Sequence, residues 1–162
     1  MVKQVAADTQ LTAVGGESRP ISEWTTTFQL LTVVLDPYTE QSAWLLETAG
    51  RILHNFRGAD VRVAWTVTAK EDDAKRFLGP WADEFLTFCD ADRELIAALE
   101  IEQLPALVYV RQDLAVVGQV EGWDPEEWET LGRLVGKVNS WSYPKLPAAG
   151  DPGAFAGSPA KG

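Results

Sequence analysis

Residues 28–35 read FQLLTVVL, and residues 36–39 read DPYT. Apolar side chains fill both alternating positions of the first segment, which is the pattern of a parallel strand buried on both faces. Asp36 and Pro37 then break the strand, and apolar residues recur at helical spacing through residues 41–56. The stretch therefore predicts a buried strand followed at once by an amphipathic helix, with His54 on the polar side of that helix.

The rest of the chain continues this alternation of strands and helices. The predicted elements are a strand at 61–67, a short charged helix at 70–78, a strand at 85–89, a helix capped by Asp90, a hairpin of 106–110 and 115–120, and a helix that begins at Asp124-Pro125. The last helix is predicted to bury a stripe made of Trp128, Leu131, Val135 and Val138. The chain is therefore an α/β protein whose strands are joined by crossover helices.

This order of elements resembles the thioredoxin fold, a three-layer α/β/α sandwich with a mixed central sheet. The extra helix and strand at 70–89 are similar to the peroxiredoxin and disulfide-reductase branches of that superfamily. Leu104-Pro105 stands where the superfamily carries a cis-proline beside its active site, and Gly118 and Gly122 flank the second hairpin strand as glycines do there. The resemblance covers roughly residues 24–140 and implies that the Leu104–Pro105 bond is cis.

The redox dithiol of the superfamily is missing. The resemblance places it at Glu40-Gln41-Ser42-Ala43, and the only cysteine of the chain is Cys89. Relatives without the dithiol include chaperones and assembly factors, among them certain hydrogenase-maturation proteins. The resemblance permits such a role without selecting it, and we expect a non-catalytic domain that binds a protein or peptide in a chaperone, assembly or adaptor role and needs no cofactor. Its expected binding crevice is formed by Tyr38, Thr39, Glu40, Gln41, Ser42 and Trp44 together with Leu104 and Pro105.

Two other functions remain open. Cys89 ends a predicted strand just before a helix, where a helix dipole lowers a thiol pKa, so a single-cysteine thiol oxidoreductase or peroxidase is the alternative. The neighbouring Asp90 and Asp92 would raise that pKa, and a buried structural cysteine is the preferred interpretation. The crevice is also a candidate small-molecule site, because Thr39 and Ser42 are able to bind an anion at the helix start, although helix capping explains them without a ligand.

No metal site is predicted. The acidic run Glu71-Asp72-Asp73 and the pair Asp90 and Asp92 match no calcium-binding loop, and solvated helix ends explain them. His54 has no neighbour that would make it a catalytic base, so a surface role is expected.

Charge and hydropathy limit the partners. The net charge is −10, from 24 acidic and 14 basic residues, which disfavours binding to nucleic acid or to an anionic membrane. No segment approaches the ~18 apolar residues of a membrane span, and residues 1–8 contain no apolar stretch of signal-peptide length. We therefore expect a cytoplasmic protein, and the sequence leaves its oligomeric state open.

The chain divides into an N-terminal arm at 1–22 with one short strand, a thioredoxin-like domain at 23–141 and a Pro/Ala/Gly-rich tail at 142–162. Residues 143–155 are expected to pack on the domain in extended form, with Tyr143, Leu146 and Phe155 as anchors, and residues 157–162 are expected to fray. Five aromatic residues lie at predicted loops or element ends: Tyr38, Trp44, Trp81, Trp123 and Tyr143. They form either an exposed interface or the surface on which the tail lies.

Overall fold

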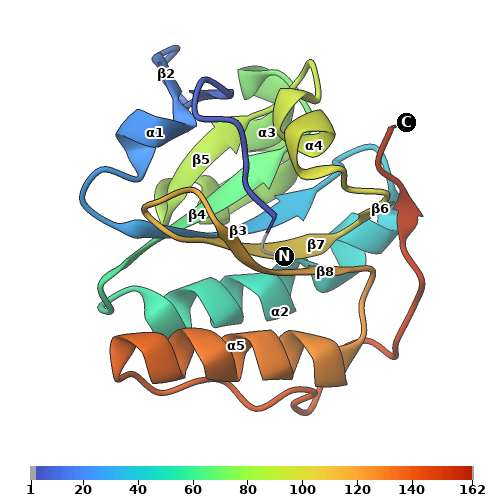
Figure 1. The fold of residues 1–162 in the computed structure, drawn as a ribbon. Coiled ribbons are helices and arrows are strands. Elements are labelled where there is room, and N and C mark those ends of the chain that lie inside the picture. The colour runs from blue at the N-terminus through green and yellow to red at the C-terminus, as the bar shows by residue number, and fades with distance from the viewer. Residues whose placement is uncertain (1–2, 162) are drawn as a thin grey trace.

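A mixed five-stranded sheet stands at the centre of the computed structural model, which describes residues 3–161 (Figure 1). The strand order is β5-β4-β3-β7-β8, in which β3, β4 and β5 run parallel and β7 and β8 form an antiparallel hairpin beside β3. The elements are β1 (Gln10–Thr12), β2 (Ser18–Pro20), α1 (Ile21–Trp24), β3 (Gln29–Leu35), α2 (Glu40–Phe56), β4 (Val61–Val67), α3 (Glu71–Leu78), the 3₁₀ helix η1 (Gly79–Asp83), β5 (Leu86–Cys89), α4 (Glu94–Leu99), β6 (Gln103–Leu104), β7 (Ala106–Val110), β8 (Val116–Glu121), α5 (Pro125–Asn139) and β9 (Ser158–Pro159).

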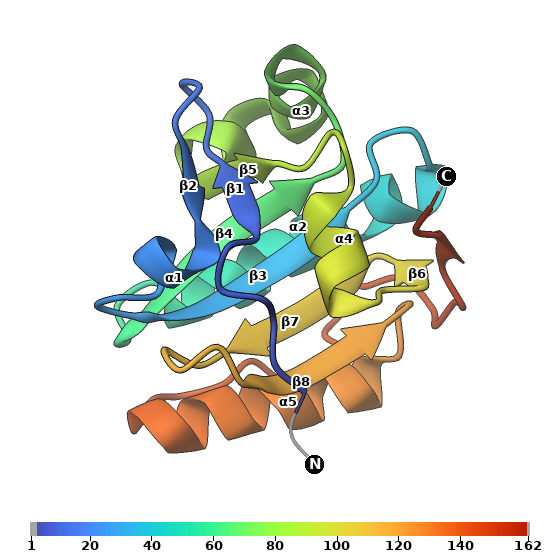
Figure 2. The ribbon, with the colours of Figure 1, turned by 45° about the horizontal axis from the view of Figure 1, so that its top comes forward.

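Helices cover the sheet on both faces. Helices α2 and α5 lie side by side on one face, whereas α4 and the N-terminal segment cover the other (Figures 1 and 2). Alternate residues of β3 enter the two cores: Leu31 and Val33 pack with α2 and α5, and Leu30 and Val34 pack with α4. This is the three-layer α/β/α arrangement that the sequence predicts.

The long elements follow their sequence patterns closely, with one error in α5. Trp128, Leu131 and Val135 are buried as predicted, but Val138 is 49% exposed. In the last turn Asn139 faces the sheet instead, and its amide nitrogen donates to the side chain of Gln29 at 3.2 Å. The stripe was wrong at Val138 because a polar side chain, Asn139, meets the sheet in the last turn, and apolar spacing does not reveal that contact.

The N-terminal arm contains more structure than the single strand predicted. Strands β1 and β2 pair with each other, and the arm also bonds both edges of the central sheet, since Val14 N–H donates to Thr87 O at 3.0 Å and Val116 N–H donates to Lys3 O at 2.7 Å. The arm thus pairs with part of each edge strand of the sheet, and unpaired edges invite pairing with other chains.

The C-terminal tail runs back along α5 and α2 and then reaches β6 (Figure 1). Leu146 is buried, and the carboxylate of Asp151 accepts two hydrogen bonds from Arg51, at 2.9 and 2.8 Å. These contacts agree with the predicted packing of residues 143–155. The predicted fraying of residues 157–162 is wrong for the described part, because β9 pairs with β6 and Ala160 is fully buried.

Candidate functional site

The residues predicted to form a crevice come from three chain segments that meet at the C-terminal end of the central strand β3. Strand β3 ends at Leu35, a turn follows, and α2 begins at Glu40. The antiparallel register pairs Val34 with Ala106, which places Pro105 beside the end of β3. The Leu104–Pro105 peptide bond is cis. The two halves of the predicted site, distant in sequence, therefore lie together (Figure 2).

Asp36 organises the turn before α2. Its carboxylate accepts the Tyr38 N–H at 3.0 Å, and its own N–H donates to Ser42 Oγ at 3.0 Å. Thr39 Oγ1 donates to the Asp36 carbonyl at 3.1 Å. Both hydroxyls are thus committed to the turn, and Thr39, the residue preceding α2, makes no capping hydrogen bond with its side chain. The structure therefore uses Thr39 and Ser42 as turn residues rather than as helix caps.

The eight predicted crevice residues differ in exposure. Tyr38 and Trp44 are 65% and 56% exposed, and Glu40 is exposed as well. Gln41 and Thr39 are half-buried, whereas the side chains of Ser42, Leu104 and Pro105 are buried. The surface of the crevice is therefore made by aromatic and polar side chains of α2 and its preceding turn on one side. The opposite side is the backbone of β6.

Strand β9 of the tail lies on that backbone. It pairs antiparallel with β6, with Ser158 opposite Leu104 and Pro159 opposite Gln103. Ser158 Oγ also donates to Gln41 Oε1 at 3.0 Å, so one residue of the tail contacts both sides of the crevice. The sequence analysis missed this contact, because Ser158-Pro159-Ala160 has neither apolar character nor a strand period.

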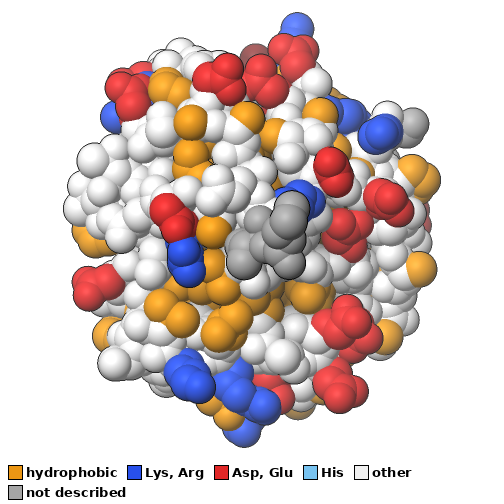
Figure 3. Space-filling model, viewed as in Figure 1, with side chains coloured by type: hydrophobic (Ala, Val, Ile, Leu, Met, Phe, Trp, Pro, Cys, Tyr) orange, Lys and Arg blue, Asp and Glu red, His pale blue; other side chains and the backbone are white. Residues whose placement is uncertain are grey.

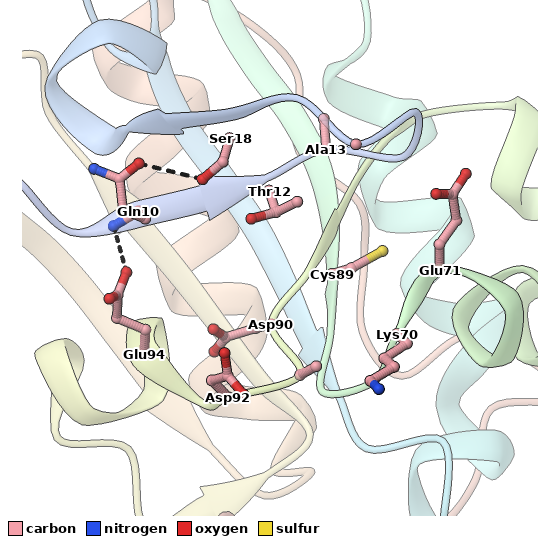
Figure 4. A pocket seen from close by; sticks show the side chains of 12 residues that line it. Gln10, Thr12, Ala13, Ser18, Lys70, Glu71, Cys89, Asp90, Asp92 and Glu94 are labelled. Carbon is pink, nitrogen blue, oxygen red and sulfur yellow. Dashed lines mark hydrogen bonds between the residues drawn. The ribbon is translucent and has the colours of Figure 1, made fainter.

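Cys89 lies outside the crevice. It ends β5, which is separated from β7 by β4 and β3, so the spacing of strands puts it about 14 Å across the sheet from the strand that follows Pro105. Figure 4 shows the thiol in a small pocket between the β1–β2 hairpin and the start of α3. Burial, and then the charge of Glu71, raise the pKa of the Cys89 thiol. The rise has the predicted direction, but burial and Glu71 cause it rather than the neighbouring aspartates. Cys89 is half-buried, which corrects the preferred interpretation of a buried cysteine.

The acidic groups beside Cys89 have structural partners. Asp90 accepts hydrogen bonds from the N–H groups of Leu95 and Ile96 at the start of α4, as its predicted capping role requires. Burial raises the pKa of Asp90, and these hydrogen bonds oppose the rise. Across residues 3–161, no group of three or more His, Cys, Asp or Glu side chains is arranged to hold a metal ion. His54 is exposed on α2.

The aromatic residues do not form one patch. Trp123 is buried, pairs edge-on with Trp128 at 5.2 Å between ring centroids, and donates its indole N–H to Pro152 O in the tail at 2.8 Å. Trp81, in η1, packs on Trp65 instead, with ring centroids 6.1 Å apart. The tail therefore covers part of the predicted set, including Trp123, and leaves Trp44 beside it half exposed.

Comparison with known proteins agrees with the fold. No family model and no curated protein matches the sequence. Among solved structures, a hypothetical protein from Sinorhizobium meliloti 1021 matches with a TM-score of 0.71 at 12% identity, covering 99% of this chain and 94% of that chain. A thiol:disulfide interchange protein DsbE from Chlorobium tepidum matches with a TM-score of 0.69 at 16% identity, covering 85% and 97% of the two chains.

A third neighbour is the Xanthomonas campestris bacterioferritin comigratory protein, whose structure is described with its alkyl peroxide reduction activity. It matches with a TM-score of 0.66 at 13% identity and covers 86% of this chain and 97% of that chain. At these identities the likeness concerns the fold and not the activity. None of the helices in residues 3–161 has the length and apolar character needed to cross a membrane. The chain thus has the thioredoxin-like fold, in a form whose single cysteine excludes a dithiol.

Proposed function

We propose that this protein is a non-catalytic thioredoxin-like domain that binds an extended segment of a protein partner in the crevice between α2 and β6. The observation that carries the proposal is the backbone of β6, which already pairs with an extended segment, the chain's own β9. Addition of a strand to an open sheet edge is a common mode of peptide recognition, in which main-chain hydrogen bonds give affinity and side-chain pockets give specificity.

The chemistry of the crevice supports binding rather than catalysis. Thiol–disulfide exchange needs a thiolate in reach of the substrate, and residues 40–43 contain none. Cys89 is displaced across the sheet, and its raised thiol pKa disfavours the reactive thiolate. Trp44, in contrast, is a large, half-exposed aromatic side chain of the type that anchors protein interfaces.

The binding test uses the full-length protein on an array of ten-residue synthetic peptides, followed by NMR titration with the peptides that bind. Amide shifts should concentrate at residues 40–44 and 102–104. Trp44→Glu should weaken binding at least tenfold, on the order of an interface anchor's contribution. His54→Glu adds the same charge on an exposed position of the same helix and should leave binding unchanged. The proposal is wrong if no peptide binds either the wild-type protein or a full-length variant whose tail is undocked, or if the shifts lie elsewhere.

The catalytic alternative has its own test. The protein should show no insulin reduction with dithiothreitol and no peroxide consumption above background. Turnover that disappears in Cys89→Ser would establish a single-cysteine oxidoreductase or peroxidase instead.

A further inference from the structure

Residues near the end of the tail make backbone and side-chain contacts with the crevice. We define the terminal segment as residues 155–160. Its backbone pairs with β6 as strand β9, and the Ala160 N–H donates to Glu102 O, next to β6, at 2.9 Å. At its other end, Phe155 exchanges two backbone hydrogen bonds with Trp123, at 2.8 and 2.9 Å.

Side chains of the terminal segment meet specific partners in the crevice. The ring of Phe155 lies edge-on to Trp44, with ring centroids 5.8 Å apart. Ser158 bonds Gln41, and Ala160 is fully buried. The aromatic ring at position 155 thus packs on Trp44, the hydroxyl at position 158 bonds Gln41, and the methyl group at position 160 is buried.

Arg93 connects the terminal segment to the turn that forms the crevice. Its guanidinium donates to the Ala160 carbonyl and also lies 3.8 Å from the carboxylate of Asp36. Because Asp36 holds the turn before α2, one side chain contacts both the docked segment and the wall of the crevice.

Two glycines allow the backbones to approach. Gly157 in the terminal segment has φ +98°, and a Cβ there would lie 2.8 Å from Leu104 O. Gly122 on the domain has φ +73°, and a Cβ there would lie 2.4 Å from Ala156 O. Side chains at either position would separate the two surfaces, so the match depends on glycine on both sides.

Charge adds a further element to the match. The protein carries a net charge of −10, and acidic side chains gather on the side of the molecule where β6 and β9 lie (Figure 3). Residues 152–162, in contrast, contain no acid and one lysine, Lys161. A ligand of this crevice is therefore favoured when it is neutral or basic.

We propose, resting on the peptide-binding function above, that the terminal segment is an intramolecular ligand of the crevice and that the partner supplies an extended segment of the same chemistry. That segment has an aromatic residue, glycine two positions later, serine or threonine three later and alanine five later, and it has no acidic residue. The partner binds by displacing the terminal segment. The apparent dissociation constant of the partner equals its intrinsic value divided by the fraction of molecules whose crevice is open.

The test measures binding of a fluorescent synthetic peptide of residues 152–162 to the full-length protein by anisotropy. Ala160→Asp places a charge at a fully buried position of the terminal segment and should open the crevice. Ala149→Asp makes the same change at an exposed position of the tail outside residues 152–162 and serves as the control. The peptide should bind Ala160→Asp at least tenfold more tightly than wild type or the control, because a tethered ligand competes at an effective concentration in the millimolar range.

Hydrogen exchange at the Phe155 N–H reports whether the segment has opened, and Gly157→Ala opens it by a second route if Ala160→Asp does not. If the peptide bound wild type and the opened variant equally well, the terminal segment would not compete for the crevice, although the crevice would still bind peptides. Failure of the peptide to bind the opened variant would overturn the terminal segment as a ligand. If peptides of the array still bound at residues 40–44, the proposed peptide-binding function would stand. If none bound there, the proposed function would be wrong as well. A wild-type dimer in size-exclusion chromatography that Ala160→Asp dissociates would show that the occupant is the tail of a second copy.

Discussion

Gly157→Ala tests the contact between the tail and the crevice with a single methyl group. In the docked tail, residue 157 adopts φ +98°, and the new Cβ would lie 2.8 Å from the Leu104 carbonyl oxygen and 3.2 Å from the Cα of Gly122. Both neighbours are backbone atoms, which do not rotate away. In the open tail the residue is free to adopt negative φ, so the substitution strains the docked state alone.

The size of the effect follows from two opposing terms. A non-glycine residue held at this φ costs about 1–3 kcal/mol, and the short contact adds to that cost. Replacing glycine also reduces the freedom of the open tail, which favours docking by about 0.4–1 kcal/mol. The net shift towards the open state is therefore about 1–2 kcal/mol, or roughly 5- to 30-fold in the opening equilibrium.

Native-state hydrogen exchange measures this equilibrium directly. When closing is fast, the exchange rate of a protected amide is proportional to the open population. The amides of Ala160 and Phe155, which donate to Glu102 O and Trp123 O at 2.9 Å each, should exchange roughly 5- to 30-fold faster in Gly157→Ala. Amides of β3 should not change, since that strand lies in the centre of the sheet.

Gly153→Ala provides the matched control. A Cβ at Gly153 has no atom within 4 Å, and its φ lies outside the left-handed region. Exchange at the Ala160 N–H should stay the same or slow slightly in this variant. Unchanged exchange in Gly157→Ala, or equal acceleration in both variants, would refute the reasoning. The factor found by exchange should also appear as tighter binding of the 152–162 peptide, if the terminal segment competes for the crevice.

Three further outcomes are expected. Asp124→Ala should lower the free energy of unfolding in urea by about 1 kcal/mol, because this carboxylate accepts the Glu126 and Glu127 N–H groups at 3.1 and 3.4 Å; an unchanged denaturation midpoint would contradict this. Burial raises the pKa of Asp151, but hydrogen bonds from Arg51, from a backbone N–H and from a threonine outweigh it and hold the pKa below the ordinary 3.8. The ionised carboxylate therefore stabilises the folded protein fully above pH 3.8, and this stabilisation is lost as the pH falls through the lower pKa of the folded state. The melting temperature of wild type should therefore exceed that of Asp151→Asn at neutral pH, with a gap that narrows below pH 3.8; a constant gap would contradict the linkage. Finally, iodoacetamide should alkylate Cys89 more slowly at pH 8 than it alkylates a free thiol, since burial raises the thiol pKa, and faster alkylation would support the catalytic alternative.

The central layers could be predicted from the sequence because their signals are local. The uninterrupted apolar run of β3 and the helical period of α2 each need only neighbouring residues to be recognised, and both elements end within a residue of the prediction. The start of α5 was equally clear, since Asp124-Pro125 combines a cap with a proline at the first helical position. Val138 was misplaced because a half-buried polar contact, from Asn139 to Gln29, fixes the last turn, and apolar periodicity carries no information about that contact.

The residues of the crevice could be predicted from the sequence, whereas the segment that occupies it could not. That the residues of the predicted crevice lie together could be predicted from the order of elements, because the end of a central strand, the helix after it and the loop before the hairpin meet at the same end of the sheet in this topology. The occupant could not, since residues 157–160 are glycine, serine, proline and alanine, whose sequence resembles a flexible tail. Their fit depends on tertiary features instead: Gly122 accepts the approaching backbone, Gln41 accepts the Ser158 hydroxyl, and Ala160 is buried although it is small. Small residues are favoured in such a place because main-chain pairing requires close approach, so the lack of apolar character that made the segment look disordered is the property that lets it dock.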